Sequence, residues 1–194
     1  MHSKKMTIEE HPLQPFLPEQ AQVLFLGSFP PPRKRWSMEF FYPNWLNDFW
    51  RIMGLIFLDD KHALEEAGAK RFCLERVVAL ARERGLAFYD TATQVCRTRD
   101  NASDQYLEIQ KPTDVAALLD RIPHCHTVVT TGGKASEELL RQTDAAAIPA
   151  VGTCTRCRIG QHKVAWWRMP STSRAYPMSL ERKAEHYRLL FAQM

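Results

Sequence analysis

The chain has 194 residues, of which 45% are hydrophobic and 25% charged, and its formal net charge is +4. These values are ordinary for a soluble globular protein, and the length predicts one domain over residues 1–194 with a core of its own. No run approaches the ~20 apolar residues that a membrane-spanning helix needs. The N-terminal residues contain no apolar signal core, so we expect a cytoplasmic monomer with its five cysteines reduced.

The first half of the chain predicts one strand and two helices. Residues 21–29, "AQVLFLGSF", form a short apolar run closed by glycine and proline, which is typical of a buried parallel strand. Residues 46–57 carry large apolar side chains at helical spacing, with Asn47 and Asp48 in the first turn. Residues 69–85 predict an amphipathic helix that stops at Gly85.

The second half continues the alternation of strands and helices. Residues 86–92 predict a strand that ends at Asp90, and 112–123 predict a helix. Residues 126–133 predict a third strand, which runs into a helix at 134–143. A fourth strand begins at 162 and breaks into a loop before 177, and a closing helix covers 179–193.

This alternation predicts an α/β fold, a three-layer α/β/α sandwich with a central, mainly parallel four-stranded sheet. In such sheets ligands bind beyond the carboxyl ends of the strands. The segments that follow those ends are rich in glycine, proline, serine, threonine and arginine: "GSFPPPRKRW", "YDTATQVCRTR", "TTGGKAS" and "RMPSTSRAYP". We therefore expect a site for an anionic ligand at this edge.

Several common sites are excluded or disfavoured. The Walker pattern is absent because Ala135 follows Lys134, and turn glycines explain "TTGGKAS" more simply. Cys154 and Cys157 form a CxxC with no second ligand pair, so structural thiols are favoured over a metal site. Asp90, at a strand end, fits a general base and a turn cap equally well.

Three segments taken together indicate a function more specifically than any single motif does. They are Gly27-Ser28-Phe29-Pro30, then Tyr42-Pro43-Asn44-Trp45-Leu46-Asn47-Asp48-Phe49-Trp50, then Met169-Pro170-Ser171-Thr172-Ser173-Arg174. In spacing and type they resemble the motifs of the uracil-DNA glycosylase superfamily, nearest to its hypoxanthine-DNA glycosylase branch and then to the mismatch-specific uracil-DNA glycosylases. The resemblance covers most of the chain.

The resemblance implies an enzyme that extrudes a deaminated base from DNA, hypoxanthine or uracil, and hydrolyses its N-glycosidic bond without metal or cofactor. Gly27, Ser28, Phe29 and Pro30 would shape the base pocket with Asn44, and Tyr42 would stack on the base. Asn47 would position water or the leaving base, with Asp48 and Asn44 as substitutes and Asp90 as a weaker candidate for the water. Without the resemblance, Asn47 serves equally well as a helix N-terminal residue that satisfies backbone donors.

DNA contacts are implied at two loops. The loop of Pro170, Ser171, Thr172, Ser173 and Arg174 would enter the minor groove, with Thr172 as a small wedge and Tyr176 assisting. The two serines would hold phosphates. Arg33, Lys34 and Arg35 would add phosphate contacts that weaken with salt.

The chain also departs from the superfamily's motifs. Phe29 stands where the mismatch-specific enzymes carry their water-positioning asparagine, prolines follow where a glycine is usual, Trp45 replaces a proline, and Asn44 stands where histidine is common. These changes surround the pocket, so the preferred base does not follow from the motifs. Two alternatives stay open: a non-catalytic nucleic-acid-binding relative, and an enzyme that acts on free nucleosides or nucleotides.

Overall fold

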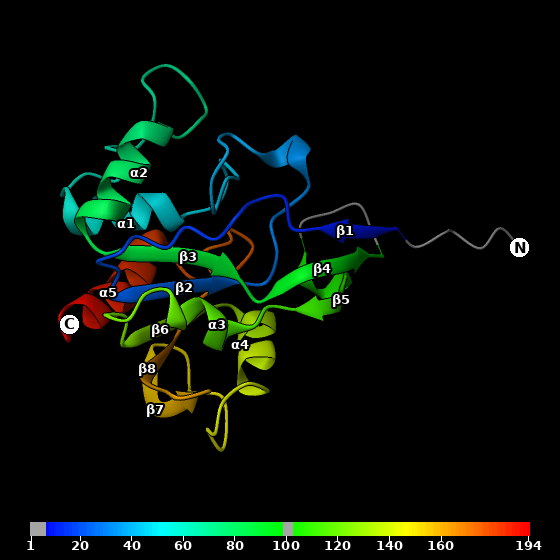
Figure 1. The fold of residues 1–194 in the computed structure, drawn as a ribbon. Coiled ribbons are helices and arrows are strands. Elements are labelled where there is room, and N and C mark those ends of the chain that lie inside the picture. The colour runs from blue at the N-terminus through cyan, green and yellow to red at the C-terminus, as the bar shows by residue number, and fades with distance from the viewer. Residues whose placement is uncertain (1–6, 99–102) are drawn as a thin grey trace, which may run out of the picture.

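The computed structural model describes residues 7–98 and 103–194 (Figure 1). The strands are β1 (Ile8–Glu10), β2 (Val23–Gly27), β3 (Leu86–Asp90), β4 (Ala92–Arg97), β5 (Leu107–Pro112), β6 (Thr127–Thr131), β7 (Thr153–Ile159) and β8 (His162–Met169). The helices are α1 (Phe49–Phe57), α2 (Leu74–Glu83), α3 (Val115–Asp120), α4 (Gly133–Leu140) and α5 (Leu180–Phe191), with short 3₁₀ turns η1 (Arg33–Arg35) and η2 (Asp104–Tyr106).

The main sheet has the strand order β3-β2-β6-β8-β7. The four predicted strands are all present and parallel, and β7 adds an antiparallel edge strand. The predicted α/β sandwich with a mainly parallel sheet is therefore confirmed, with one strand more than expected. Only one side of β7 packs on the core, so its sequence "TCTRCRI" alternates and lacks the continuous apolar run of a central strand.

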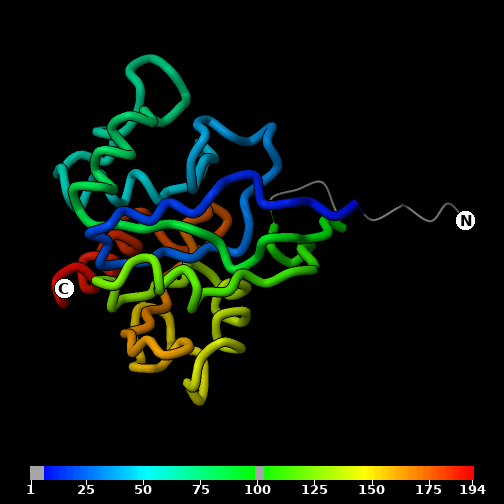
Figure 2. Tube along the Cα trace, in the orientation of Figure 1, coloured from blue at the N-terminus to red at the C-terminus, as the bar shows by residue number. Residues whose placement is uncertain are grey.

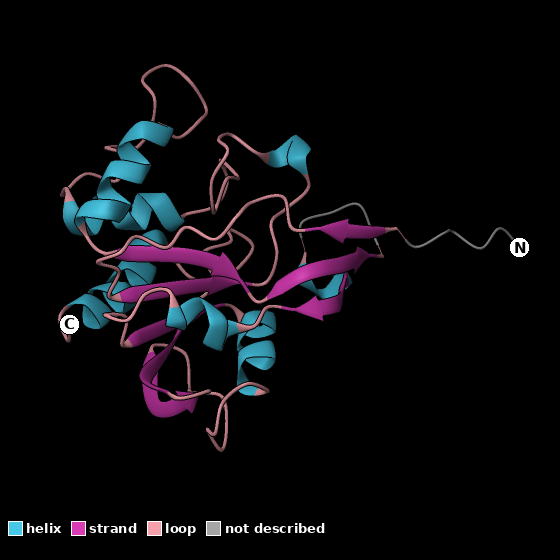
Figure 3. Ribbon diagram, in the orientation of Figure 1, coloured by secondary structure: helices cyan, strands magenta, loops and turns pink. Residues whose placement is uncertain are grey.

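The helices cover both faces of this sheet (Figure 3). The chain moves from β2 to β3 in one direction and from β3 through β6 to β8 in the other, so right-handed crossovers place α1 and α2 on one face and α3 and α4 on the opposite face. Helix α5 returns to pack against α1. Within the described residues, no helix combines the length and the apolar character that crossing a bilayer requires.

Strands β2 and β3 are buried along their whole length. Every residue of β2 and of β3 is buried, which explains why both read as unbroken apolar runs. Aromatic rings fill the space above them. Phe25 stacks on Phe88 with ring centroids 5.6 Å apart, and Phe49 meets Phe25 edge-on at 5.2 Å.

Helix α2 begins at Leu74, five residues later than predicted. Phe72 has an exposed fraction of 1% and packs against Trp45, and the backbone N–H of Cys73 donates to the carbonyl of Leu64. These residues therefore belong to a packed turn although their apolar spacing suits a helix. Tertiary packing has overridden local propensity at this boundary.

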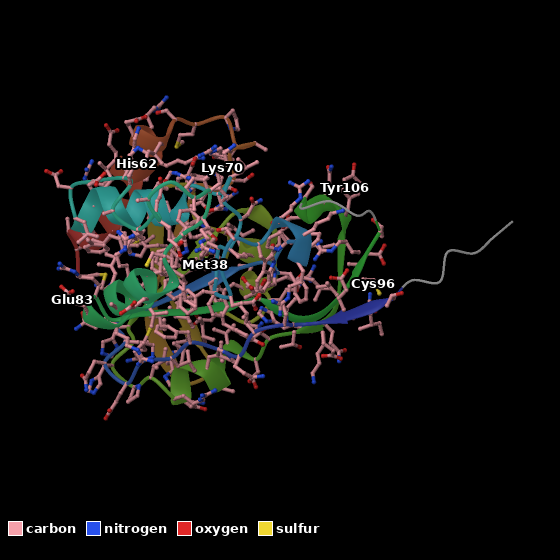
Figure 4. The ribbon with its side chains drawn as sticks, turned by 90° about the horizontal axis from the view of Figure 1, so that it is seen from above. Met38, His62, Lys70, Glu83, Cys96 and Tyr106 are labelled. Carbon is pink, nitrogen blue, oxygen red and sulfur yellow. The ribbon has the colours of Figure 1, made fainter. Side chains whose placement is uncertain are left out.

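A second, three-stranded sheet of order β1-β4-β5 was not predicted. It extends from the end of β3, and the chain after β1 then runs back along the free edge of β3 (Figure 2), where Phe16 pairs with Phe88 through two backbone hydrogen bonds. Cys96 and Tyr106 both belong to this region, at the end of the molecule opposite Glu83 (Figure 4). The small sheet thus brings the N-terminal residues against the carboxyl end of β3.

A glycine substitution tests the packing around α1. A Cβ on Gly54 would lie 2.6 Å from the backbone carbonyl oxygen of Asp60, so Gly54→Ala should lower the free energy of unfolding by about 1–3 kcal/mol. Gly133→Ala is the matched control, because no atom lies within 4 Å of its Cβ position, and we expect a change below about 1 kcal/mol. Denaturant unfolding of both variants measures the difference; equal stability would contradict the packing described for α1.

Candidate active site

A cavity of about 590 Å³ lies at the carboxyl ends of the parallel strands. The last residues of β2, β3 and β6, which are Gly27, Asp90 and Thr131, all line it. Most of the predicted site residues meet there: Gly27, Ser28, Phe29, Pro30, Arg35, Tyr42, Asn44, Asn47, Asp90, Ser171, Thr172, Ser173 and Arg174. Arg33, Lys34, Asp48 and Pro170 are not part of the lining.

Tyr42 is fixed in an unusual backbone conformation. Its φ angle is +52°, in the left-handed region that a bulky residue occupies at a cost of about 1–3 kcal/mol. The ring stacks on Phe49 with centroids 4.0 Å apart, and the hydroxyl hydrogen-bonds the hydroxyl of Thr131 at 2.8 Å. Burial raises the pKa of this phenol well above its usual range, so it stays neutral. With one ring face taken by Phe49, only the opposite face can accept a ligand.

The two asparagines at the cavity share one arrangement. Oδ1 of Asn44 accepts from the backbone N–H of Leu46 at 3.0 Å, and Oδ1 of Asn47 accepts from that of Phe49 at 2.9 Å. Each amide oxygen therefore accepts from the backbone N–H two residues ahead, as in an Asx turn, and for Asn47 this N–H belongs to Phe49, the first residue of α1. The NH₂ group is what each side chain can offer the cavity, so both asparagines are suited to donate.

Arg51 binds the backbone of the segment that carries these asparagines. Its guanidinium donates to the carbonyl oxygens of Trp45 and Asn47 at 2.8 and 3.1 Å, and it pairs with Glu65 at 2.7 Å. The same group lies 4.4 Å from the ring centroid of Trp45. The side chain is 6% exposed, and these contacts compensate the charge that helix α1 carries into the interior.

Asp48 does not have the position of a catalytic residue. Its carboxylate receives the Nζ of Lys183 at 3.1 Å and the Nε of Arg174 at 3.3 Å, and its backbone N–H donates to the carbonyl of Thr172 at 2.9 Å. Lys183 is 1% exposed and also donates to the carbonyl of Ser173. The substitute catalytic role predicted for Asp48 is therefore corrected: this residue fastens the 170–174 loop to the start of α1.

The 170–174 loop borders the cavity, but its predicted wedge is wrong. Thr172 has an exposed fraction of 2%, and its backbone carbonyl accepts from the N–H of Asp48. Pro170 is buried too, and its carbonyl accepts from the hydroxyl of Tyr187. Ser173 and Arg174 are exposed at the rim. A residue this deeply packed cannot enter a base stack. Ser173 and Arg174 are exposed to a ligand, and Arg174 is at the same time paired with Asp48.

Asp90 lies against Gly27 across the β2–β3 pair. A Cβ on Gly27 would come within 2.5 Å of Oδ1 of Asp90, so only glycine leaves room for the carboxylate. The other oxygen, Oδ2, is 2.8 Å from Nε2 of His11. Of the two roles left open by the sequence, turn cap and general base, this partner favours the second, because the carboxylate is held by a side chain and not by the turn.

Ser28 and Phe29 connect the cavity to the small sheet. The hydroxyl of Ser28 donates to Oδ1 of Asp104 at 2.7 Å. Asp104 lines the cavity, and burial raises the pKa of its carboxyl while the hydrogen bond from Ser28 opposes that rise. Phe29 is 9% exposed and packs with Val95 and Leu107 in a second apolar cluster. His11 and Asp104 were both missed, since neither belongs to a recognisable motif and both are far from the other site residues in sequence.

The basic run at η1 is exposed and only partly beside the cavity. Arg33 pairs with Glu39 and stacks over Trp36 with its guanidinium carbon 4.2 Å from the ring centroid. Lys34 is exposed away from the lining, and Arg35 is the member that borders the cavity. Of the three predicted phosphate contacts, Arg35 is thus the nearest to the site.

The CxxC lies on β7, where Cys154 is exposed and Cys157 buried. Residues three apart on a strand point to opposite faces, so the two thiols do not converge. In the described parts of the chain, 7–98 and 103–194, no three histidine, cysteine, aspartate or glutamate side chains come together as metal ligands would.

Replacing Lys183 tests the fastening of the loop. Lys183→Met leaves the buried Asp48 carboxylate with Arg174 alone, and we expect a loss of about 3 kcal/mol in the free energy of unfolding. Lys61→Met, at an exposed position, is the control and should change stability by less than about 0.5 kcal/mol. Chemical denaturation followed by tryptophan fluorescence gives both values. A Lys183 variant as stable as the control would show that the ion pair does not hold the loop.

Comparison with known proteins identifies the fold. No family model matches the sequence, and neither does any curated protein. A solution NMR structure from Methanosarcina acetivorans, described as a "putative Uracil DNA glycosylase", superposes with a TM-score of 0.60 at 22% sequence identity. The match covers 94% of this chain and 96% of that one, so the two proteins share one fold over almost their whole length.

Proposed function

We propose that this protein is a monofunctional DNA glycosylase that takes a deaminated base, hypoxanthine or uracil, into the cavity and hydrolyses its N-glycosidic bond. The main support for this proposal is that an aromatic ring, an amide donor and a carboxylate line one cavity, namely those of Tyr42, Asn47 and Asp90. Its volume of about 590 Å³ is in the ordinary range for small-molecule sites. The fold shared with the Methanosarcina protein, and the use that protein's description implies, support the same assignment.

Tyr42 and the asparagines act on the base. The free face of the Tyr42 ring stacks on the extruded base, and its backing by Phe49 keeps the ring from rotating away. The bond breaks with its electron pair moving onto the base, which becomes anionic. Asn47 then stabilises that charge with its NH₂ donors, because its oxygen is already occupied by the backbone. We therefore assign Asn47 to the leaving base and not to the water.

Asp90 acts on the water. As the C1′–N bond opens, the water oxygen forms a bond to C1′, and the water proton passes to Oδ1 of Asp90. The proton held by Asp90 then passes through solvent to the departing base, at the nitrogen that was bound to the sugar. This restores the carboxylate and leaves an abasic deoxyribose in the strand. Asp90 lines the cavity, and Oδ1 is the carboxylate oxygen that His11 does not bind, so we assign the proton to Oδ1.

The rim supplies the DNA contacts. Arg35 and Arg174 meet phosphates on either side of the extruded nucleotide, with Ser171 and Ser173 as neutral donors. Leu46 is 49% exposed and lines the mouth of the cavity, which suits it to fill the gap in the base stack that Thr172 cannot reach. The enzyme works as a monomer on DNA that contains a damaged or mismatched base.

An excision assay tests the function. Duplexes and single strands containing uracil or hypoxanthine should be broken by alkali after incubation with the protein, because each excision leaves an abasic site. Asp90→Asn should slow excision by about 10²–10⁴-fold and Asn47→Ala by about 10²–10³-fold. Asp59→Asn, at an exposed carboxylate, is the control and should retain the parent rate.

The same assay separates the alternatives. Salt-sensitive DNA binding with no excision of either base would replace the proposal with a non-catalytic binding protein. Release of bases from free nucleosides, with intact oligonucleotides, would replace it with a nucleoside hydrolase.

Two exposed leucines test the wedge. Leu46→Ala should slow excision from duplex DNA by about 10-fold, which corresponds to ~1.4 kcal/mol, because the extruded state loses the side chain that fills the stack. Excision from single strands should hardly change, since no stack has to be filled. Leu189→Ala is the matched control, as Leu189 is 54% exposed on the far helix α5. Equal losses on single and double strands would remove Leu46 from this role.

A further inference from the structure

The side chain of His11 is enclosed behind the cavity wall although its residue lies near the N-terminus. Its side chain is 2% exposed, and Nε2 lies 2.8 Å from Oδ2 of Asp90. The backbone N–H of His11 donates to the carbonyl of Thr93 at 2.8 Å, so the small sheet fixes the main chain at this point. The imidazole contacts the rings of Tyr89 and Phe29, with centroids 4.5 and 5.2 Å away. These contacts leave the imidazole one orientation.

Nδ1, the ring nitrogen that points away from Asp90, lies near two backbone groups of Leu13. Nδ1 lies 3.1 Å from the backbone N–H of Leu13 and 2.9 Å from the carbonyl oxygen of the same residue. Nδ1 can accept from the N–H when it carries no proton, and it can donate to the carbonyl when it does. A neutral imidazole carries one proton, and with that proton on Nε2 the ring donates to Oδ2 of Asp90 while Nδ1 accepts from the N–H of Leu13. We assign this tautomer, because a proton on Nδ1 would leave the Nε2 lone pair facing the carboxylate.

The carboxylate is in turn confined from the cavity side. Oδ2 is held by His11, and Oδ1 occupies the space that the missing Cβ of Gly27 leaves open. The Asp90 side chain is 11% exposed, and it lines the cavity. A carboxylate is planar and rotates as one unit. The hydrogen bond at Oδ2 therefore also fixes the direction of the lone pairs on Oδ1.

We propose that His11 is a positioning residue, which orients the Asp90 carboxylate so that Oδ1 can hold and deprotonate the attacking water. This inference rests on the proposed glycosylase function and deepens it. His11 never touches the substrate: Nε2–H donates to Oδ2 throughout, while the proton from water arrives at Oδ1. In the Ser-His-Asp triad the imidazole takes the proton and the carboxylate orients the imidazole. In this pair the carboxylate takes the proton and the imidazole orients the carboxylate.

If His11 had a purely structural role, replacing it would have a different effect. As a link between β1 and β3, its loss would lower stability and DNA binding together, and the damage would not depend on Asp90. As a positioning residue, its loss should lower the excision rate through Asp90 alone. The two roles are separable in the folded variants.

The test compares single-turnover excision rates with affinities for an uncleavable duplex. His11→Phe should slow excision by about 10²-fold while affinity changes less than about 3-fold, because a misplaced carboxylate harms the chemical step and not binding. His11→Gln keeps a donor at the Nε2 position and should recover a rate within about 10-fold of the parent. His162→Phe is the matched control: Nε2 of His162 lies 2.7 Å from Asp120 in a similar pair outside the cavity, and its rate should equal the parent's.

A double variant gives the decisive comparison. In an Asp90→Asn background, His11→Phe should cost no further rate, since the group it positions is gone. A further loss equal to that in the parent background would overturn the inference and leave a structural role. A parent-like rate for a folded His11→Phe would overturn it as well, with excision itself intact. A parent protein that excises no base would refute the proposed function and this inference together.

The inference is also testable where His11→Phe does not fold. Nitrogen-15 NMR of the parent should show a hydrogen-bonded Nε2–H of His11, assigned through its absence in His11→Gln. Asp90→Asn should move that signal, and Asp120→Asn should leave it in place. A signal insensitive to Asp90→Asn would show that the imidazole does not bear on the carboxylate.

Discussion

The buried ion pair between Asp48 and Lys183 joins the two halves of the site. Asp48 precedes α1, Lys183 belongs to α5, and the loop between β8 and α5 is bound by both of them. Two charges enclosed this deeply are tolerated only when each is paired and hydrogen-bonded, which restricts the loop to a single arrangement. The segments 41–47 and 171–177, whose residues line the cavity and whose backbones meet at Asn47 and Ser173, are therefore held together by a contact that takes no part in the proposed chemistry.

The crowded segment "FYPNWLNDFW" contributes to both the core and the cavity. Phe49 and Trp50 are fully buried in the core, whereas Tyr42, Asn44 and Asn47 line the cavity, where the backbone binds both amide oxygens. The rings give the amides a rigid base, and this rigidity is what preorganised donors need, because a donor that must reorient during the reaction loses most of its effect. The segment therefore needs both rings, which pack in the core, and amides, which face the cavity.

Sequence patterns predicted the parallel strands and the cavity they border, because buried strands read as continuous apolar runs and their carboxyl ends share one edge. They could not predict the small sheet, whose short alternating strands carry little apolar signal. Nor could they find His11, since its role depends on a contact with Asp90 79 residues away. Thr172 was misjudged for a related reason: a motif shows which residues form a loop, whereas burial of one of them depends on Asp48 and Lys183.

For the proposed DNA substrate, a carboxylate beside the cavity is at first sight unfavourable, because phosphates repel it. Arg35 and Arg174 at the rim offset that repulsion, and Asp90 lies behind them at the strand end. In the proposed reaction the sugar gains positive charge as the base departs, and a fixed negative charge nearby favours that state over the uncharged substrate. The same feature that opposes binding therefore assists the chemical step, provided that the carboxylate cannot turn toward the arginines. In this structure the imidazole of His11 prevents that rotation.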